Sequence, residues 1–565
     1  MRVIIVGGVA GGASAAARIR RLDERAQITI YERTGFVSYA NCGLPYFVGG
    51  VITDRNELFL QTPESFWQRF RVDVRVRHEV IEIRPEQKTV VVRNLMTGET
   101  LEDRYDKLLL SPGAKPTRPN MSGIDNGKIF TLRTVEDTLK IHRFVREQRP
   151  KSAAVIGGGF IGVEMAENLS QLGMKVTVIE YSDHLMAPLD FDMACAVHAQ
   201  MRKRGIELKL STAVTGFETK GGSVVIHTAS GAEMVADMVL LAVGVTPDTD
   251  LAKRAGLALG IRNSIVVNDR METSVPDIYA VGDAVEVKHF VTGKKALIAL
   301  AGPANKQGRI AADNICGGNS VFDGAQGSSV LKLFDMTVAS TGINEAQAKQ
   351  AEIDYDRIVL SPASHAGYYP GGKTMTMKVL YERNTLKLLG AQIIGQEGTD
   401  KRIDVIATAI RAGMQATALA ELDLAYAPPY SSAKDPVNMA GYMIENIVTG
   451  KVKQFHLVEI DAILRDGSVT LIDTLTSGEY SEGHADGFIN VPLDELRERM
   501  IAIPKDRPVY IMCQSGLRSY LACRILSQNG YNCFHFSGGY RFYAMVKEGK
   551  KQAETTYPCG MDRRQ

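Results

Sequence analysis

The sequence predicts an α/β protein built from several domains, and three observations support this fold class. The chain has 565 residues, which is too long for one hydrophobic core and indicates about three to five folding units. An apolar strand, a glycine turn and a helix begin at residue 2, and the pattern returns at residue 152. A third apolar strand, at residues 508–512, leads into a loop and another helix.

Composition and charge exclude several classes of function. The net charge of +2 provides no field that would attract nucleic acid. No apolar run approaches the ~20 residues that a membrane span needs, and the N-terminus does not resemble a secretory leader. Seven cysteines spread over the chain do not form the pattern of a disulfide framework. We therefore expect a cytoplasmic protein that binds neither membranes nor nucleic acid, and we expect no metal site.

The N-terminal stretch RVIIVGGVAGGASAAARIRRL predicts a dinucleotide-binding unit. Its glycines let the backbone approach a pyrophosphate, and the helix N-terminus supplies N–H donors. The next strand, QITIYE, ends in Glu32, which can accept a hydrogen bond from a ribose hydroxyl. The alternative is a tight turn that binds nothing, but the strand, helix and acid together favour binding. The glycines are Gly7, Gly8, Gly11 and Gly12.

A second unit of the same type follows in SAAVIGGGFIGVEMAENLSQLGMKVTVIEY. Gly157, Gly159 and Gly162 complete the G-x-G-x-x-G spacing, and Glu180 ends the following strand. An acid at this place repels the 2′-phosphate of NADP. The pattern therefore favours NADH, with NADPH as the alternative.

Two such units about 150 residues apart resemble the flavoprotein pyridine nucleotide-disulfide oxidoreductases. LLLSPGAKP and LLAVGVTPDT are similar to the crossover segments of that family, and TSVPDIYAVGDA places Gly282 and Asp283 at its FAD contacts. The resemblance covers residues 1–445 and implies FAD in the first unit and NADH in the second. It implies further cofactor contacts at Ala10, Arg33, Val80, Ser111, Gly113, Arg133, Ile161 and Gly244.

The stretch SYANCGLPYF contains one cysteine, Cys42. The positions where a dithiol enzyme has its second cysteine hold Tyr46 and Phe47, so the chain resembles the single-cysteine branch: NADH oxidases, NADH peroxidases and coenzyme A disulfide reductases. Thiolate is the nucleophile, so we expect the site to lower the pKa of the Cys42 thiol. The alternative is a buried structural cysteine. Ala10 replaces the histidine of the oxidases and peroxidases, which disfavours oxygen or peroxide as the oxidant.

The helix after the first glycine turn carries Ser14, Arg18, Arg21 and Arg25 at spacings that put them on one face. Arginines in a row suit phosphate groups, although a solvated charged face is the alternative. The resemblance to coenzyme A disulfide reductases implies that this face binds coenzyme A. The implied contacts are Ser14, Arg18, Arg21, Ser38, Asn41, Asn305 and Lys434.

Two tyrosines from the later part of the chain complete the implied site. Tyr368, in SHAGYYPGG, and Tyr426, in AYAPPYSSAKDP, match tyrosines that reach the reactive cysteine across a dimer interface in that family. Their hydroxyls can donate to a leaving thiolate. Their neighbours Tyr369 and Tyr430 are expected to pack. We therefore expect a homodimer.

Beyond about residue 450 the chain continues with GSVTLIDTLTSGEYSEGHADGFINVPLDEL and then RPVYIMCQSGLRSYLACRILSQNGYNCFHFSGGYRFY. These two stretches resemble a rhodanese module. Its strand leads into Cys513 and a loop whose N–H groups stabilise a thiolate or persulfide, and Arg518 would hold the loop or a charged substrate. Asp473-Thr474-Leu475 replaces the usual Asp-Val-Arg, which disfavours thiosulfate as the sulfur donor. The other cysteines are interpreted as structural or, for Cys559, as exposed without an assigned role. They are Cys195, Cys316, Cys523, Cys533 and Cys559.

The predicted fold is α/β, with two Rossmann-like dinucleotide-binding domains, an α+β dimerisation domain and a C-terminal α/β rhodanese domain. The predicted boundaries are 1–148 with 271–325 for FAD, 149–270 for NAD, 326–445 for dimerisation, 446–462 for a linker, 463–550 for rhodanese and 551–565 for a tail.

These features predict an NADH-dependent flavoprotein that reduces persulfide or polysulfide sulfur, such as coenzyme A persulfide, to hydrosulfide at Cys42. In this hypothesis Cys513 handles the sulfane sulfur. Coenzyme A disulfide reduction uses the same residues and is the main alternative. An NADH oxidase or peroxidase, and a protein that carries persulfide to a partner, are the others.

Overall fold

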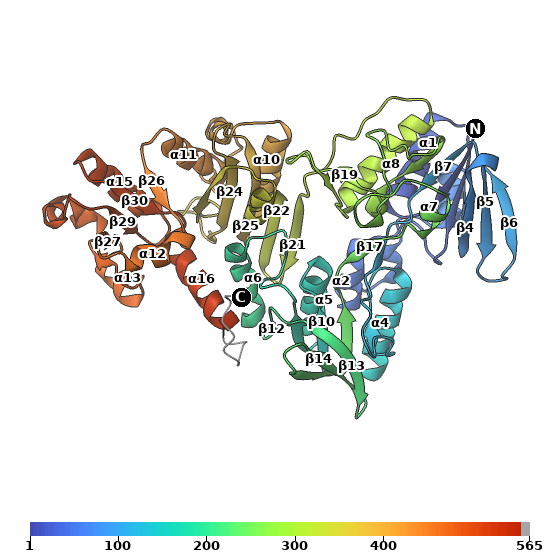
Figure 1. Ribbon diagram of the computed structural model, residues 1–565, viewed down its shortest axis with the longest axis horizontal. Coiled ribbons are helices and arrows are strands. Elements are labelled where there is room, and N and C mark those ends of the chain that lie inside the picture. Colours follow the sequence, from blue (N-terminus) through green and yellow to red (C-terminus); the bar gives the residue numbers. More distant parts are fainter. Residues whose placement is uncertain (555–565) are drawn as a thin grey trace. The chain divides into compact units, whose positions relative to one another are not determined.

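The structure is a computed structural model that describes residues 1–554 (Figure 1). The chain folds into two compact units. The first contains residues 1–182 and 205–327, and the second contains residues 183–204 and 328–554. Within the described part, no helix combines the length and the apolar character needed to cross a membrane.

The first unit begins with a five-stranded parallel sheet in the order β18-β7-β1-β2-β3. Its central strand β1 (Arg2–Val6) buries Val3, Ile4 and Ile5 completely, because both faces of a parallel sheet are covered. An antiparallel sheet, β4-β5-β6, follows. The elements of this part are β2 (Gln27–Glu32), β3 (Val72–Val76), β4 (His78–Arg84), β5 (Thr89–Asn94), β6 (Thr100–Arg104), β7 (Lys107–Leu110), β18 (Ile278–Ala280), β19 (Val287–Lys288), β20 (Lys295–Ala296), α1 (Ala10–Leu22), α2 (Leu44–Val48), α3 (Pro63–Phe70), α7 (Asp250–Arg254) and α8 (Ala301–Ile315).

A second parallel sheet in the same unit has the order β12-β11-β10-β16-β9 and repeats the β1–α1–β2 arrangement as β10–α5–β11. An antiparallel pair, β8 and β17, lies in the two predicted crossover segments. The elements are β8 (Ala114–Pro116), β9 (Ile129–Phe130), β10 (Ser152–Ile156), β11 (Lys175–Ile179), β12 (Glu207–Lys209), β13 (Val214–Lys220), β14 (Ser223–Thr228), β15 (Glu233–Ala236), β16 (Met238–Leu241), β17 (Val245–Pro247), α4 (Val135–Gln148) and α5 (Phe160–Gln171).

The second unit contains an antiparallel sheet in the order β21-β22-β25-β24-β23. Residues 183–204, which the sequence analysis places in the NAD domain, belong to this unit. The reason lies in Lys378, which is completely buried and forms ion pairs with Asp190 (2.9 Å), Asp192 (2.8 Å) and Glu345 (2.5 Å). The elements are α6 (Phe191–Lys203), α9 (Glu345–Gln350), α10 (Thr399–Arg411), α11 (Pro436–Val448), β21 (Ser329–Leu333), β22 (Met336–Gly342), β23 (Tyr355–Leu360), β24 (Thr376–Glu382) and β25 (Leu388–Gly395).

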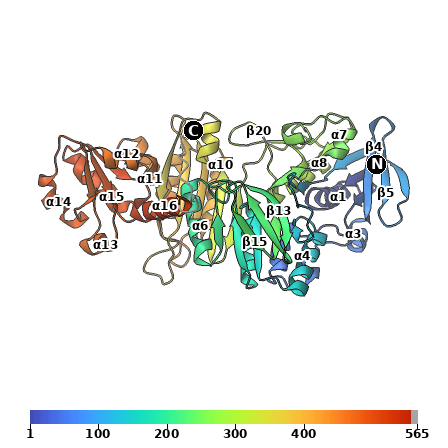
Figure 2. The same ribbon diagram turned by 60° about the horizontal axis from the view of Figure 1, so that its bottom comes forward.

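The C-terminal part of the second unit is a five-stranded parallel sheet in the order β26-β30-β29-β27-β28. Its edge strand β26 (Lys453–Phe455) lies in the segment 446–462 that was expected to be a linker. The last helix, α16 (Gly539–Glu554), continues past residue 550 and packs against α6, as Figures 1 and 2 show. The other elements are β27 (Thr470–Asp473), β28 (Ile489–Asn490), β29 (Val509–Met512), β30 (Cys533–Phe536), α12 (Ile460–Arg465), α13 (Ser477–Glu482), α14 (Leu496–Arg499) and α15 (Leu517–Gln528).

Candidate functional site

The first glycine turn joins β1 to α1 and leaves no room for side chains. Gly7 has a φ of +94°, and a Cβ there would collide with the carbonyl oxygen of Ser111. A Cβ on Gly12 would collide with the carbonyl oxygen of Gly7, and one on Gly11 would approach Val281. The Gly12 N–H donates to Ser111 Oγ at 3.1 Å. The turn therefore exposes backbone at the N-terminus of α1, where a pyrophosphate can bind.

The second glycine turn, between β10 and α5, repeats these contacts. Gly157 has a φ of +105°, and a Cβ there would collide with the carbonyl oxygen of Ala242. A Cβ on Gly162 would collide with the carbonyl oxygen of Gly157. Around Gly159, by contrast, no described atom lies within 4 Å of a Cβ position. Gly159 therefore faces open space, as the approach of a pyrophosphate to the turn requires.

The two predicted ribose-binding acids have matching environments. Glu32 accepts a hydrogen bond from the N–H of Gly8 at 2.9 Å, and Glu180 accepts one from the N–H of Gly158 at 2.6 Å. Glu180 also accepts from the N–H of Ser182 at 2.7 Å. Each carboxylate thus lies beside its glycine turn, and the two units offer the same arrangement to a dinucleotide.

Two ion pairs connect the remaining charged residues predicted to contact FAD. Arg133 pairs with Asp283 at 2.8 Å, and Arg33 pairs with Asp248 at 2.6 Å. The N–H of Gly282 donates to the side-chain oxygen of Gln307 at 2.7 Å. Neither Asp248 nor Gln307 is predictable as a site residue from the sequence, because no spacing rule connects residues that meet only in the folded chain.

The uncharged cofactor positions fit the same site. Gly113 and Gly244 have φ values of +71° and +99°, which require glycine, and both follow strands of the two parallel sheets. Val80 is buried in β4, Ala10 is the first residue of α1 and Ile161 lies in the first turn of α5. The two glycine turns and the acids at the ends of the following strands fit the two dinucleotides that the sequence predicts.

Cys42 lies in a short helical turn, Asn41–Gly43, immediately before α2. The residue is exposed, but the partial burial of its thiol and the nearby carboxylate of Glu164 raise the pKa of this thiol. The expected lowering is therefore not produced by the described protein groups. Asn41 Oδ1 is buried and has no hydrogen-bond partner among the described residues, and Ser38 has a φ of +47°. A free acceptor and a strained backbone beside a cysteine are typical of a ligand site.

Glu164, on α5, is a functional candidate that the sequence analysis missed. Burial and the neighbouring Glu167 raise its pKa to about 7, while a hydrogen bond from Tyr46 opposes this shift. The Tyr46 hydroxyl donates to the Glu164 carboxylate at 3.3 Å. The available signal in the sequence was a glutamate four residues after the helix start, preceded by apolar residues, which is too weak to predict a site. Glu164 is thus a titratable acid close to Cys42, and Tyr46 holds its carboxylate by a hydrogen bond.

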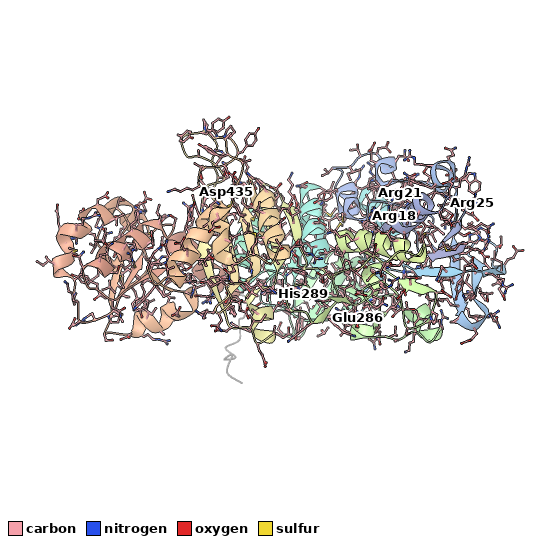
Figure 3. The ribbon with its side chains drawn as sticks, turned by 90° about the horizontal axis from the view of Figure 1, so that it is seen from above. Arg18, Arg21, Arg25, Glu286, His289 and Asp435 are labelled. Atoms are coloured by element: carbon pink, nitrogen blue, oxygen red, sulfur yellow. The ribbon has the colours of Figure 1, made fainter. Side chains whose placement is uncertain are left out.

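The predicted coenzyme A face of α1 is only partly free. Arg18 forms an ion pair with Asp313 of α8 at 2.6 Å, and Ser14 makes a short hydrogen bond to Asn305 of the same helix. Arg21 and Arg25 are exposed. Figure 3 shows Arg18, Arg21 and Arg25 together on the first unit. The structure thus brings Ser14, Arg18 and Asn305 into one cluster, with two further guanidinium groups beside it.

Tyr368 and Tyr426 lie on two different loops of the second unit. Their hydroxyl oxygens are 2.6 Å apart, although the residues are 58 positions apart in the sequence. Tyr368 is 76% exposed and Tyr426 is 45% exposed. Tyr369 and Tyr430, which were expected to pack, are also exposed. Lys434, the remaining predicted coenzyme A contact, is exposed on the Tyr426 loop.

Cys513 follows β29 and is buried in the loop before α15. Its Sγ accepts a hydrogen bond from the N–H of Gly516 at 3.1 Å and donates to Ser519 Oγ at 3.5 Å. The N–H of Tyr540 donates to the Cys513 carbonyl at 2.7 Å, so the first turn of α16 anchors the backbone of the loop. N–H donors that point at Sγ stabilise a thiolate or persulfide.

Arg518 is engaged by Glu479 of α13 in two hydrogen bonds of 2.7 and 2.9 Å. These bonds lower the pKa of Glu479 to about 2. Asp473, at the end of β27, is completely buried, and its burial raises its pKa to about 6. Its Oδ2 has no partner among the described residues. Arg518 therefore connects the start of α15 to α13, and its expected role in the site stays a prediction.

The other cysteines have structural surroundings. Cys195 is buried, and Gly549 of α16 packs directly against its sulfur. The Cys533 thiol donates to the carbonyl of Cys523 at 3.3 Å inside the C-terminal core. Cys316 is half-buried after α8. Cys559 lies outside the described residues.

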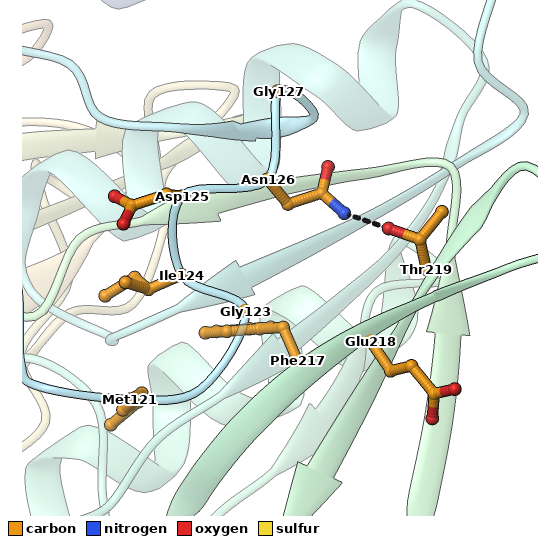
Figure 4. A pocket seen from close by; sticks show the side chains of 9 residues that line it. All are labelled: Met121, Gly123, Ile124, Asp125, Asn126, Gly127, Phe217, Glu218 and Thr219. Carbon is orange, nitrogen blue, oxygen red and sulfur yellow. Dashed lines mark hydrogen bonds between the residues drawn. The ribbon is translucent and has the colours of Figure 1, made fainter.

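A shallow hollow in the first unit lies away from the predicted residues. It is formed by the loop 121–127 and by Phe217, Glu218 and Thr219 of β13 (Figure 4). The Asn126 side-chain amide donates to Thr219 Oγ1 at 2.6 Å across it. None of the residues predicted for cofactor or substrate binding lines this hollow.

Comparison with known families divides the chain into three matched regions. Residues 1–308 match the pyridine nucleotide-disulphide oxidoreductase family, and residues 328–436 match the dimerisation domain of the same proteins. Residues 457–545 match the rhodanese-like domain. A coenzyme A disulfide reductase from Staphylococcus haemolyticus is 37% identical over 447 residues, which are 79% of this chain and 100% of that protein.

Solved structures resemble the chain over nearly its whole length. The crystal structure of reduced CoADR-RHD from Bacillus anthracis is 48% identical, with a TM-score of 0.95, and the match covers 97% of this chain and 98% of that one. A NAD-dependent persulfide reductase from A. fulgidus is 38% identical, with a TM-score of 0.90 and coverage of 96% and 100%. A water-forming NADH oxidase from Lactobacillus brevis is 28% identical, with a TM-score of 0.77 and coverage of 80% and 99%.

Proposed function

Because the chain belongs to the pyridine nucleotide-disulphide oxidoreductases, we propose that it is a flavin- and NADH-dependent enzyme that reduces persulfide or polysulfide sulfur to hydrosulfide. The observation that carries this proposal is the pairing of an exposed single cysteine, Cys42, with a rhodanese loop that cradles Cys513 in the same chain. The similarity to a persulfide reductase and to CoADR-RHD over more than nine-tenths of the chain supports it.

The residues of the first unit would hold both dinucleotides. The turn at Gly7 and the acid Glu32 would bind FAD, and the turn at Gly157 and the acid Glu180 would bind NADH. When bound, FAD supplies the transfer of two electrons from NADH to sulfur at Cys42.

The thiolate of Cys42 would attack the inner sulfur of a persulfide anion, R–S–S⁻, and the outer sulfur would take up a proton as it departs and leave as hydrosulfide. The products are a mixed disulfide between Cys42 and the carrier R–S, and HS⁻. Two electrons then return Cys42 and the carrier to thiolates. Tyr368 and Tyr426 would donate the proton that the leaving sulfur needs. Coenzyme A is the proposed carrier, seated by the cluster of Ser14, Arg18 and Asn305.

Cys513 would receive sulfane sulfur and pass it to the carrier. Its Sγ already accepts the N–H of Gly516, which favours the anionic form of a thiol or persulfide. Because Cys42 and Cys513 belong to one chain, a persulfide formed at Cys513 stays at high effective concentration near Cys42. The matched dimerisation domain supports a homodimer, and free thiols as substrates suit the cytoplasm.

The second candidate function is reduction of coenzyme A disulfide itself, which the arginines of α1 favour and which uses the same Cys42. Ala10, at the start of α1, occupies the position where the oxidases and peroxidases have a histidine, which disfavours these two activities. A persulfide carrier would depend on Cys513 alone.

The test is anaerobic NADH consumption by the wild type, Cys42→Ser and Cys513→Ser with coenzyme A persulfide, polysulfide and coenzyme A disulfide in turn. We expect Cys42→Ser to lose turnover with every oxidant, and Cys513→Ser to keep turnover with small persulfides. Full turnover of Cys42→Ser would disprove the proposal. Loss of all turnover in Cys513→Ser would favour the carrier. In a parallel aerobic assay without a sulfur compound, fast turnover with oxygen alone would favour the oxidase.

A further inference from the structure

The loops that carry Tyr368 and Tyr426 converge on one buried arginine, Arg402 of α10. Its side chain is 1% exposed. Its Nη2 lies 3.1 Å from the carbonyl oxygen of Ser364, on the first loop, and 3.2 Å from the carbonyl oxygen of Tyr430, on the second. One guanidinium group therefore contacts the backbone of both loops.

An aspartate and a serine hold this guanidinium in place. Asp435, labelled in Figure 3, lies 2.9 Å from Nη2 and 3.2 Å from Nε, and it accepts the N–H of Val437 at the start of α11. Ser431 Oγ donates to Asp435 at 2.7 Å and lies 3.0 Å from Nη2. On the other side, Nη1 donates to the Gly398 carbonyl at 3.2 Å. The charge is thus neutralised, and the contacts reach three separate chain segments.

Only arginine can make these contacts at once. A guanidinium presents five N–H donors in one plane, whereas a lysine ammonium is a single point with three donors. Because Arg402 and Asp435 are both buried, loss of Asp435 removes the counter-ion of the guanidinium, and loss of Arg402 leaves Asp435 with Lys401 alone, 4.0 Å away. The loops would have to move to bring water to the remaining charge.

The position of the tyrosine pair depends on the two loops, because neither ring is packed in a hydrophobic core. Both rings are exposed, so their 2.6 Å hydroxyl contact follows from the position of the two loop backbones. The N–H of Ala366 donates to the carbonyl of Ser431 at 3.0 Å. Within residues 1–554, this is the only direct backbone hydrogen bond between the two loops. Ser431 itself is held by Arg402.

We propose that Arg402, paired with Asp435, is a positioning residue that aligns Tyr368 and Tyr426 as a proton-donating pair. The inference rests on the proposed role of the two tyrosines at the leaving sulfur. Arg402 touches neither cofactor nor substrate and acts through the loops alone.

The test is a double-mutant cycle on the FAD-loaded full-length enzyme, with Arg402→Lys, Tyr426→Phe and both together. Arg402→Lys is expected to lower kcat for persulfide reduction by about tenfold to a hundredfold, since misplacement of a reacting group costs rates of this order. The KM for NADH should not change. In the Arg402→Lys background, Tyr426→Phe should lower kcat less than about twofold further, because the pair is already disrupted. Arg465→Lys makes the same change at an exposed arginine of α12 in the same unit, is the matched control and should behave as the wild type.

The outcomes separate this inference from the proposed function. If Tyr368→Phe and Tyr426→Phe alone keep full turnover, the proposed role of the tyrosines is wrong. If these variants lose turnover but the effects of Arg402→Lys and Tyr426→Phe simply multiply, the positioning role is wrong. Should Arg402→Lys fail to fold, Ser431→Ala, which removes one hydroxyl from the cluster, replaces it in the cycle and must show the same non-additivity.

Discussion

The guanidinium of Arg518 donates to both carboxylate oxygens of Glu479, at 2.7 and 2.9 Å. A cation beside the Cys513 loop is thus neutralised by the protein itself. Leu475, where the usual rhodanese pattern has a second arginine, adds no compensating charge. We therefore expect Cys513 to take sulfane sulfur from a thiol-bound donor rather than from a dianionic one.

Glu479→Gln should release Arg518 and raise sulfur transfer from thiosulfate to cyanide by several-fold, because a free guanidinium attracts the anionic donor. Initial rates at low ionic strength measure this. Glu482→Gln removes the same charge from an exposed position of α13 and is the control. An equal rise in both variants would show that net charge, rather than Arg518, controls the donor.

Glu164 should give the reactivity of Cys42 a distinctive pH dependence. As the pH rises through about 7, Glu164 loses its proton, and the new negative charge opposes ionisation of the Cys42 thiol. Glu164→Gln removes that charge, so we expect the alkylation rate of Cys42 to rise at lower pH than in the wild type. Iodoacetamide kinetics between pH 5 and 10 measure the shift. Glu57→Gln, an exposed acid of the same unit, should leave the profile unchanged, and an unchanged profile in Glu164→Gln would refute the coupling.

A substitution in each of the two glycine turns should weaken the binding of a different cofactor. A Cβ at position 12 collides with the carbonyl of Gly7, so Gly12→Ala should lose FAD, as measured by flavin absorbance after gel filtration. Gly162→Ala meets the carbonyl of Gly157 and should keep FAD but bind NADH weakly. Gly127→Ala, where a Cβ has open space, is the control. Retention of FAD by Gly12→Ala would contradict the assignment.

Lys378 should be essential for the stability of the second unit. Lys378→Met leaves the largely buried Asp190 and Asp192 without their cation, while Glu345 keeps Arg357 at 3.1 Å, and we expect a cost of about 3–5 kcal/mol of unfolding free energy. Urea unfolding followed by circular dichroism measures the loss. Lys332→Met removes an exposed lysine from strand β21 of the same sheet and should change stability by less than about 0.5 kcal/mol. Similar midpoints for both variants would disprove the role of the buried cluster.

Local patterns predicted the parts of the site whose contacts are local. The collision that excludes a side chain at Gly12 involves Gly7, five residues earlier, so the spacing of the glycines already contains the turn. The acids Glu32 and Glu180 each lie one strand further along and contact the N–H groups of the same turns. Cys42 and Cys513 were predicted from short motifs in the same way.

Partners brought together over long distances were not predictable. Tyr46 and Glu164 are 118 positions apart, and Arg518 and Glu479 are 39 apart, with no periodicity that connects them. The assignment of residues 183–204 to the second unit depends on Lys378, nearly two hundred positions later. Strand β26, inside the expected linker, forms because it pairs with β30, about 80 residues further on.

The sequence by itself determined the architecture, the two glycine turns and the two cysteines that we propose to react, because backbone sterics and strand–turn–helix patterns act between near neighbours. Only the tertiary structure decided which charges meet: Glu164 beside Cys42, Glu479 on Arg518, and Arg402 between the tyrosine loops. The physical reason is that the strength of an ion pair or a hydrogen bond depends on distance and burial in space, and the separation along the chain sets neither.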